Sequence, residues 1–146
     1  MAEKKKAEME TIKIENFFTR DNEEKGVWFE AVVNGQKTGI EGLVLGANSS
    51  TAIIATNQWN KEIEEQKLIE DDIERNAQYE MSCAKRVAAI VSKLRGKDGK
   101  ELSFKGKTSL DKSDIEEIML NSPAMAASFL SFSNRNANFL EGKKNS

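Results

Sequence analysis

The sequence is poor in the residues on which most catalytic sites depend. Among its 146 residues it has no histidine, one cysteine and one proline. Without histidine there is no Ser-His-Asp triad, no cysteine–histidine dyad and almost no catalytic zinc site of a known type. With one cysteine the chain forms neither an internal disulfide nor a Cys-x-x-Cys metal knuckle. The remaining possibilities are carboxylate or lysine catalysis, a carboxylate-bound hard cation, or no catalysis.

The chain also lacks an excess of positive charge, since 22 Lys and Arg face 24 Asp and Glu. Proteins that bind a nucleic-acid backbone usually carry a basic excess, so we expect no nucleic-acid partner. Apolar runs such as residues 87–91 are far too short to span a membrane, so we expect no membrane partner. The single cysteine and the lack of a recognisable secretory signal predict a reducing, cytoplasmic location.

The length indicates one domain, with polar and charged residues at both ends. We predict a disordered tail over residues 1–10, a single α+β domain over 11–140 and a polar tail over 141–146. Within the domain, the sheet is expected in residues 11–46 and a mainly helical body in 48–140. Residues 12–18 could form a first strand or a short element that docks on the sheet, and residues 20–26 are interpreted as a loop.

A β-hairpin is the clearest local signal. Residues 27–33 (VWFEAVV) are rich in β-branched and aromatic side chains, and a second run, residues 36–45, follows directly. Asn34 and Gly35 separate the two runs, and both tolerate the positive φ that a type I′ turn requires. A hairpin alone is marginal in water, so this one must pack on helices or pair with a further strand.

Residues 51–94 contain neither proline nor glycine and are predicted to be helical, with Gly96 as the stop. Apolar residues recur at steps of three and four from Ile69, which predicts that the C-terminal half is buried and the middle is solvated. Ser109 or Asp111 is expected to cap the next helix. A break at residues 121–123 should then lead to a final helix that ends near residue 138.

Carboxylates dominate residues 61–75, where seven acidic side chains face three basic ones. Carboxylate pairs on helices hold metal ions in some bundles, but those sites also use Glu-x-x-His pairs, and this chain has no histidine. We therefore interpret the stretch as an exposed helix face in which Asp71 and Arg75 are spaced for an ion pair. We predict no metal and no other cofactor.

Three further features favour structural roles, and we predict that the protein is not an enzyme. Asp98 and Gly99 indicate a turn, because the other oxygen ligands of a calcium loop are missing. Cys83 lies beside an apolar stripe with no histidine to activate its thiol, so it is interpreted as a small buried hydrophobe. The glycines at 39, 42 and 46 do not match a phosphate-binding loop.

Four short motifs, in order, carry a family resemblance: residues 26–29 (GVWF), 45–49 (LGANS), 94–104 (LRGKDGKELSF) and 138–140 (NFL). This arrangement, which covers most of residues 26–140, resembles the small tail assembly chaperones of long-tailed bacteriophages and related small tail proteins. One departure is that a tryptophan often precedes the Gly-Lys-Asp-Gly turn in that group, whereas Lys-Leu-Arg stands here at 93–95.

The resemblance implies a non-enzymatic protein in the cytoplasm of an infected bacterium. It would bind the tape measure protein, keep that long helical chain soluble, and help to recruit tail tube subunits. The main alternative is a structural virion component of the tail or of the head–tail junction. A carboxylate-metal enzyme and an acidic regulatory protein are weaker alternatives, and a homo-oligomer is possible.

Two sets of residues are candidates for the partner-binding surface. Trp59 precedes the acidic stretch and Ile63 lies at its start, and an apolar anchor beside a polar rim is typical of a binding surface. Met125, Phe129 and Phe132 on the last helix form the second set, because methionine and aromatic side chains adapt to varied partners. The same three residues are also expected to face the core.

Overall fold

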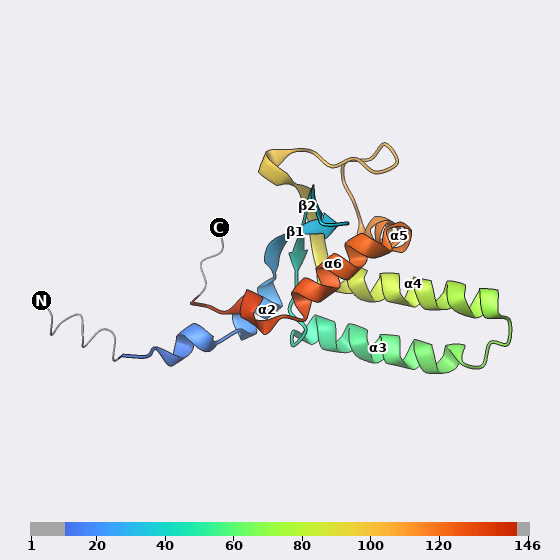
Figure 1. Ribbon diagram of the computed structural model, residues 1–146, viewed down its shortest axis with the longest axis horizontal. Coiled ribbons are helices and arrows are strands. Elements are labelled where there is room, and N and C mark those ends of the chain that lie inside the picture. The colour runs from blue at the N-terminus through green and yellow to red at the C-terminus, as the bar shows by residue number, and fades with distance from the viewer. Residues whose placement is uncertain (1–10, 143–146) are drawn as a thin grey trace, which may run out of the picture.

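The computed structural model describes residues 11–142 and has an α+β architecture, as predicted (Figure 1). A three-stranded antiparallel sheet of order β1-β2-β3 packs against helices. The elements, in chain order, are η1 (Ile14–Phe17), α2 (Arg20–Lys25), β1 (Val27–Val33), β2 (Gln36–Val44), α3 (Ser50–Gln66), α4 (Asp72–Ile90), β3 (Val91–Gly96), η2 (Lys97–Gly99), α5 (Lys112–Asn121), α6 (Pro123–Ser133) and η3 (Asn136–Phe139). No helix among the described residues is long and apolar enough to cross a membrane.

The predicted hairpin is confirmed as β1 and β2. Asn34 and Gly35 have φ angles of 52° and 77°, the left-handed values that a type I′ turn needs. The strands pair from Val33 with Gln36 to Val27 with Val44, with one irregularity near Ala31. The turn chemistry therefore sets the register of the hairpin.

The third strand is a correction to the sequence prediction. The helix expected to continue to residue 94 ends at Ile90, and Val91–Gly96 forms β3 along the free edge of β2. Val91 pairs with Val44, and both side chains are fully buried. Pairing with β2 satisfies the open backbone groups of that edge and buries a β-branched residue, which local helix propensity does not anticipate.

The acidic stretch is a second correction, because residues 51–94 do not form one helix. The chain turns back at residues 67–71, and α3 and α4 pack side by side as a helical hairpin. The carboxylate of Asp71 caps α4 by accepting a hydrogen bond from the Ile73 N–H at 3.1 Å. The predicted Asp71–Arg75 ion pair is therefore wrong, and Arg75 pairs with Asp72 instead.

The N-terminal part of the domain is a third correction. Residues 12–18 form no strand but carry the short helix η1, and the predicted loop is mostly the helix α2. The sheet therefore begins at Val27 rather than at residue 11. The segment lies against the end of the described chain, where the Glu141 N–H donates to the Phe18 carbonyl at 2.9 Å. The predicted tails at 1–10 and 143–146 lie outside the described residues.

The C-terminal helices close the core, with α6 on the sheet and α5 against α4 and α6. Asp111 caps α5 in a reciprocal capping box with Asp114, as one of the two predicted caps. The last helix, α6, ends at Ser133 instead of near residue 138, and η3 follows it. The sheet and these helices share an aromatic core, whose members are Phe29, Phe129, Phe132 and Phe139.

Candidate partner-binding groove

The helical hairpin of α3 and α4 projects away from η1 and from the sheet (Figure 1). The main contacts of α3 are with α4, whereas α4 also packs on α5 and α6 through its C-terminal half. Burial follows this arrangement, since Ala88 is fully buried near the body and Ile73 is 82% exposed near the turn. One face of the hairpin is thus available along much of its length.

A hollow of about 300 Å³ lies where the hairpin meets the body. Trp59 of α3, Tyr79 and Cys83 of α4, and residues of α5 and α6 line it, and most of the lining is apolar. The contributions of the body include Leu120, Pro123, Ala127 and Leu130. Four helices therefore meet around one apolar hollow.

A second hollow, of about 380 Å³, lies nearer the turn of the hairpin and is lined by charged and polar residues. It shares Tyr79 with the first hollow, so the two are neighbours on the same face. Their lining residues follow helical spacing, with Trp59 and Ile63 on α3 and Lys67 directly after its end. We call the two hollows together the hairpin groove.

Trp59 is the largest side chain of α3 in the groove, and it is half-buried. The guanidinium of Arg86 lies 4.7 Å from the centre of its ring, a cation–π contact that holds the indole against α4. The indole Nε1 is buried and has no hydrogen-bond partner among the described residues. A buried polar atom without a partner is uncommon, and it lies here in a residue that lines the groove.

Tyr79 and Cys83 stand one helical turn apart on α4 and form the middle of the groove. A hydrogen bond between the phenol and the thiol is the main cause that raises the pKa of Tyr79 above its ordinary value. Tyr79 is nevertheless 45% exposed, and Cys83 is half-buried. Cys83 is therefore in part accessible, which corrects the prediction of a small buried hydrophobe at this position.

The contact between α3 and α4 is partly polar. The Gln66 side-chain amide donates to the Ser82 hydroxyl at 2.7 Å, and that hydroxyl donates to Glu62 at 2.8 Å. Gln66 and Ser82 are both buried, so these bonds are shielded from water and fix how the two helices lie against each other. This network positions Trp59 and Ile63 relative to α4.

Charge is distributed unevenly along the groove. Near the turn, Lys67 pairs with Glu64 at 2.8 Å and Arg75 pairs with Asp72. Arg75 also donates to the Ile69 carbonyl at 2.7 Å. The charged side chains that line the second hollow are two cations and one carboxylate, those of Lys67, Arg75 and Asp72, so the acidic excess of residues 61–75 lies outside the groove lining.

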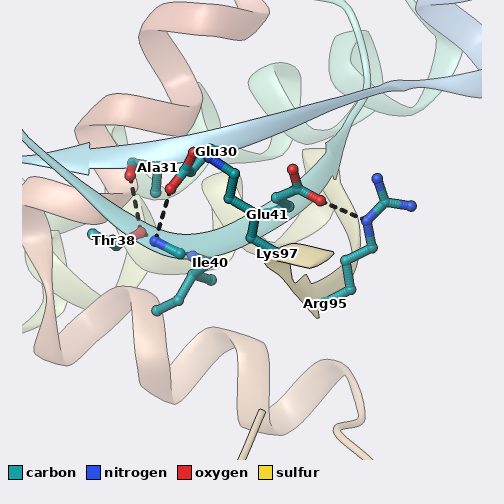
Figure 2. Close-up of polar contacts among 8 residues, drawn as sticks. Glu30, Ala31, Thr38, Ile40, Glu41, Arg95 and Lys97 are labelled. Atoms are coloured by element: carbon teal, nitrogen blue, oxygen red, sulfur yellow. Dashed lines mark hydrogen bonds and ion pairs between the residues drawn. The ribbon is translucent and has the colours of Figure 1, made fainter. Parts of the chain in front are cut away.

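The sheet carries a polar cluster of a different kind (Figure 2). Glu41 pairs with Arg95 at 2.7 Å, and Glu30 pairs with Lys97 at 3.2 Å. Glu30 also accepts a hydrogen bond from the Gly39 N–H at 2.9 Å, which is the main cause of its lowered pKa. Glu41 thus has a cross-strand partner on β3, a stabilising arrangement, whereas Lys97 lies in η2 directly after β3. Among residues 11–142 no group of three or more acidic or cysteine side chains is placed to hold a metal ion.

The structure separates the two predicted sets of binding residues. Trp59 and Ile63 both line the groove, although in different hollows. Phe129 is fully buried and Met125 is 8% exposed, while Phe132 stacks on Phe29 with ring centres 4.3 Å apart. Met125 and Phe129 therefore face the core, which was the other expectation for this set, whereas Phe132 packs against the core and is partly exposed.

Sequence reasoning missed several groove residues. Tyr79, Cys83 and Arg86 are spaced by four and three residues, which places them on one face of a helix. This spacing is visible in the sequence, but the face lies beside the more regular apolar stripe that begins at Ile69. Leu120 and Leu130 come from α5 and α6, and no local pattern indicates which residues of those helices meet α4. Comparisons of the chain with family models, with curated proteins and with solved structures found no match.

Proposed function

We propose that the protein is a tail assembly chaperone of a long-tailed bacteriophage, which binds the tape measure protein and helps to recruit tail tube subunits. It would act in the cytoplasm of the infected cell and without catalysis. The observation that carries the proposal is the apolar hollow of the hairpin groove, which lies at the meeting point of four helices and is lined in part by Trp59 and Tyr79. Grooves of this type take the apolar face of a helix, which suits a long helical client.

The chemistry of the chain agrees with a binding role. With no histidine in the sequence, proton transfer at neutral pH would need a perturbed carboxylate, lysine or cysteine. The carboxylates of the sheet cluster are paired with cations instead. The resemblance of residues 26–140 to the tail assembly chaperones points in the same direction.

Co-expression tests the proposal. The tape measure protein encoded with this chain, or a helical fragment of it, should be insoluble alone, and should become soluble and elute with the chain on size exclusion. If the fragment stays insoluble and no complex elutes, the proposal is wrong.

A structural virion component is the second candidate, and the η1 segment favours it. Ile12, Ile14 and Phe17 are 75%, 69% and 65% exposed, so this end of the molecule carries an apolar surface of its own. A permanent neighbour in the particle would cover it. Mass spectrometry of purified virions separates the two functions, because a chaperone leaves the particle and a component stays.

A further inference from the structure

We propose that the apolar hollow beside Trp59 binds a small amphiphilic carboxylate, a molecule with an apolar body of roughly ten carbons and one acid group. The lining of the hollow is mostly apolar, and it includes the half-buried cation Arg86, which has no carboxylate partner among the described residues. The binding of this ligand does not depend on the proposed function, although both use the same hollow.

The size and the lining of the hollow determine the body of the ligand. The hollow measures about 300 Å³, and Trp59, Leu120 and Leu130 are among the side chains that line it. An apolar cavity of about 150 Å³ holds one benzene ring, so a hollow of twice that volume has room for roughly ten to twelve carbons. Ligand sites of this kind are mostly apolar and contain a few polar groups that orient the ligand.

Arg86 determines the head group of the ligand. Among residues 11–142, three cationic side chains are half-buried, those of Arg75, Arg86 and Lys97. Arg75 and Lys97 each pair with a carboxylate. Arg86 makes neither an ion pair nor a hydrogen bond with the described residues, and its guanidinium lies against the ring of Trp59. Burial of a charge is costly unless the charge is paired, so an anionic head group beside Arg86 would stabilise the complex.

The lining holds hydrogen-bond donors that match a carboxylate. A guanidinium has five N–H donors in a planar fork that suits the two oxygens of a carboxylate. The buried Nε1 of Trp59 also has no hydrogen-bond partner among the described residues. A carboxylate in the hollow would therefore supply acceptors to two lining residues whose donors lack them.

Glu80 is the one carboxylate among the lining residues, and it does not neutralise Arg86. The Glu80 side chain is exposed and accepts a hydrogen bond from the Asn76 amide at 3.1 Å. Arg86 is half-buried instead, and no ion pair joins it to Glu80. The more buried charge of the lining is therefore positive, and it selects an anionic head group over a cationic one.

The scarce residues of the chain supply two reporters for a test. Cys83 is the only cysteine and lines the hollow, so the rate at which its thiol reacts with a neutral disulfide reagent reports access to the hollow. Trp59 is one of two tryptophans, and a Trp28→Phe variant leaves it as the only one. The probes are decanoate, decylammonium and decanol, which share an alkyl body and differ in the charge of the head group.

Decanoate, used below its micelle-forming concentration, should change the emission of Trp59. It should slow the reaction of Cys83 by about tenfold when its concentration is about ten times its Kd. It should also bind about tenfold more tightly than decylammonium, because only the carboxylate pairs with Arg86.

Two substitutions on α6 test whether the hollow is the site. Ala127→Phe should abolish the binding of decanoate, because Ala127 lines the hollow and is exposed, so that a phenyl ring there occupies the space of the ligand. Its control is Ala124→Phe, which changes an exposed residue of the same helix outside the lining and should leave binding unchanged.

The head-group preference is tested at Arg86. Arg86→Gln should weaken the binding of decanoate by about tenfold and leave that of decanol unchanged, whereas Arg86→Lys keeps the charge and should weaken it less. Lys85→Gln is the matched control, because it removes the same charge from the neighbouring exposed residue, which does not line the hollow. Equal weakening by Arg86→Gln and Lys85→Gln would mean that the attraction is general, and would overturn the proposal.

Three other results would also overturn it. Equal binding of decanoate and decylammonium would mean that the hollow selects no head group. Binding of decanoate without protection of Cys83 would place the site elsewhere. Protection of Cys83 by a leucine–glutamate helix of about 15 residues, when decanoate gives none, would make a helix of a partner the occupant.

The carboxylate site and the chaperone function fail in distinguishable ways. If decanoate binds in the hollow and the tape measure fragment stays insoluble on co-expression, the function is wrong and the carboxylate site stands. If the fragment is kept soluble and decanoate does not bind, the carboxylate site is wrong and the function stands.

Discussion

The body of the molecule and the end of its helical hairpin are built from similar residues but differ in what covers them. In the body, Phe29 packs against Phe129 with ring centres 6.2 Å apart, and Phe129 is fully buried. At the hairpin turn, Leu68 and Ile73 are more than four-fifths exposed. The helix α4 joins both regions: its C-terminal half, which the apolar pattern predicts to be buried, is buried where α5 and α6 pack on it, whereas Ile73 of the same apolar stripe stays exposed.

The largest effect should come from the aromatic core of the body. Phe129→Ala should lower the free energy of unfolding by about 3–5 kcal/mol, because it removes a fully buried ring and leaves a cavity. A Cβ on Gly42 would lie 2.7 Å from that ring, so the strand already packs closely against it. Chemical denaturation measures the change.

Phe17→Ala is the matched control, since Phe17 is 65% exposed on η1. Its effect should stay within about 0.5 kcal/mol. Similar losses in both variants would mean that the η1 segment belongs to the core, and the contrast between covered and open regions would fail.

The interface within the hairpin should show an intermediate effect. Ser82→Ala leaves the Glu62 carboxylate without its hydroxyl donor and removes an acceptor of the Gln66 amide. The Gln66 amide keeps its bond to the Gln78 carbonyl but loses its second acceptor in a buried position, which costs about 1–3 kcal/mol. Hydrogen exchange should show that α3 opens more readily, while the amides of the sheet keep their protection.

Ser92→Ala on β3 is the control for that variant. The Ser92 hydroxyl is exposed and donates to the Leu43 carbonyl at 3.3 Å, so its removal should change protection little. Faster exchange across the whole chain in Ser82→Ala would show that the hairpin and the body unfold as one unit.

The elements that the sequence predicted well are those determined by short-range chemistry. Asn34 and Gly35 set the hairpin turn, and Asp111 caps α5 through its own neighbours. The helix start at Pro123 also follows from the residue itself, because proline suits the first helical position.

The elements that the sequence missed depend on distant partners. Val91–Gly96 is a strand because β2 offers an edge, although the same residues continue a helical pattern. The turn at residues 67–71 has neither glycine nor proline to mark it. Of the groove, Trp59 and Ile63 were predicted, but the hollow beside Trp59 exists only where α5 and α6 meet the hairpin. Local patterns do not contain that information.

A pH titration of stability tests how much the paired carboxylate of Glu30 stabilises the sheet in the body of the molecule. The Gly39 N–H and Lys97 lower the pKa of Glu30 from its ordinary 4.5. A carboxyl whose pKa is lowered in the folded state stabilises the fold at pH values above its ordinary pKa. This stabilisation is lost as the pH falls through the lowered pKa of the folded state. The free energies of unfolding of the wild type and Glu30→Gln should therefore converge on acidification below about pH 4.5.

Glu101→Gln removes the same charge at an exposed position and serves as the control. If the difference in the free energy of unfolding between Glu101→Gln and the wild type shrinks on acidification as much as the difference for Glu30→Gln does, the pH dependence reflects overall charge. In that case the contacts of Glu30 with the Gly39 N–H and Lys97 are not its cause.

The smallest effect on stability should come from the open end of the hairpin. Leu68→Ser should change the free energy of unfolding by less than about 0.5 kcal/mol, because Leu68 is 83% exposed and loses almost no buried surface. Leu130→Ser, at a half-buried leucine that packs against the core, is the contrasting variant and should cost clearly more in the same denaturation experiment. A large loss for Leu68→Ser would mean that the turn is covered in the free protein. A negligible loss means that this exposed leucine is dispensable for folding, in contrast with the leucine that packs against the core.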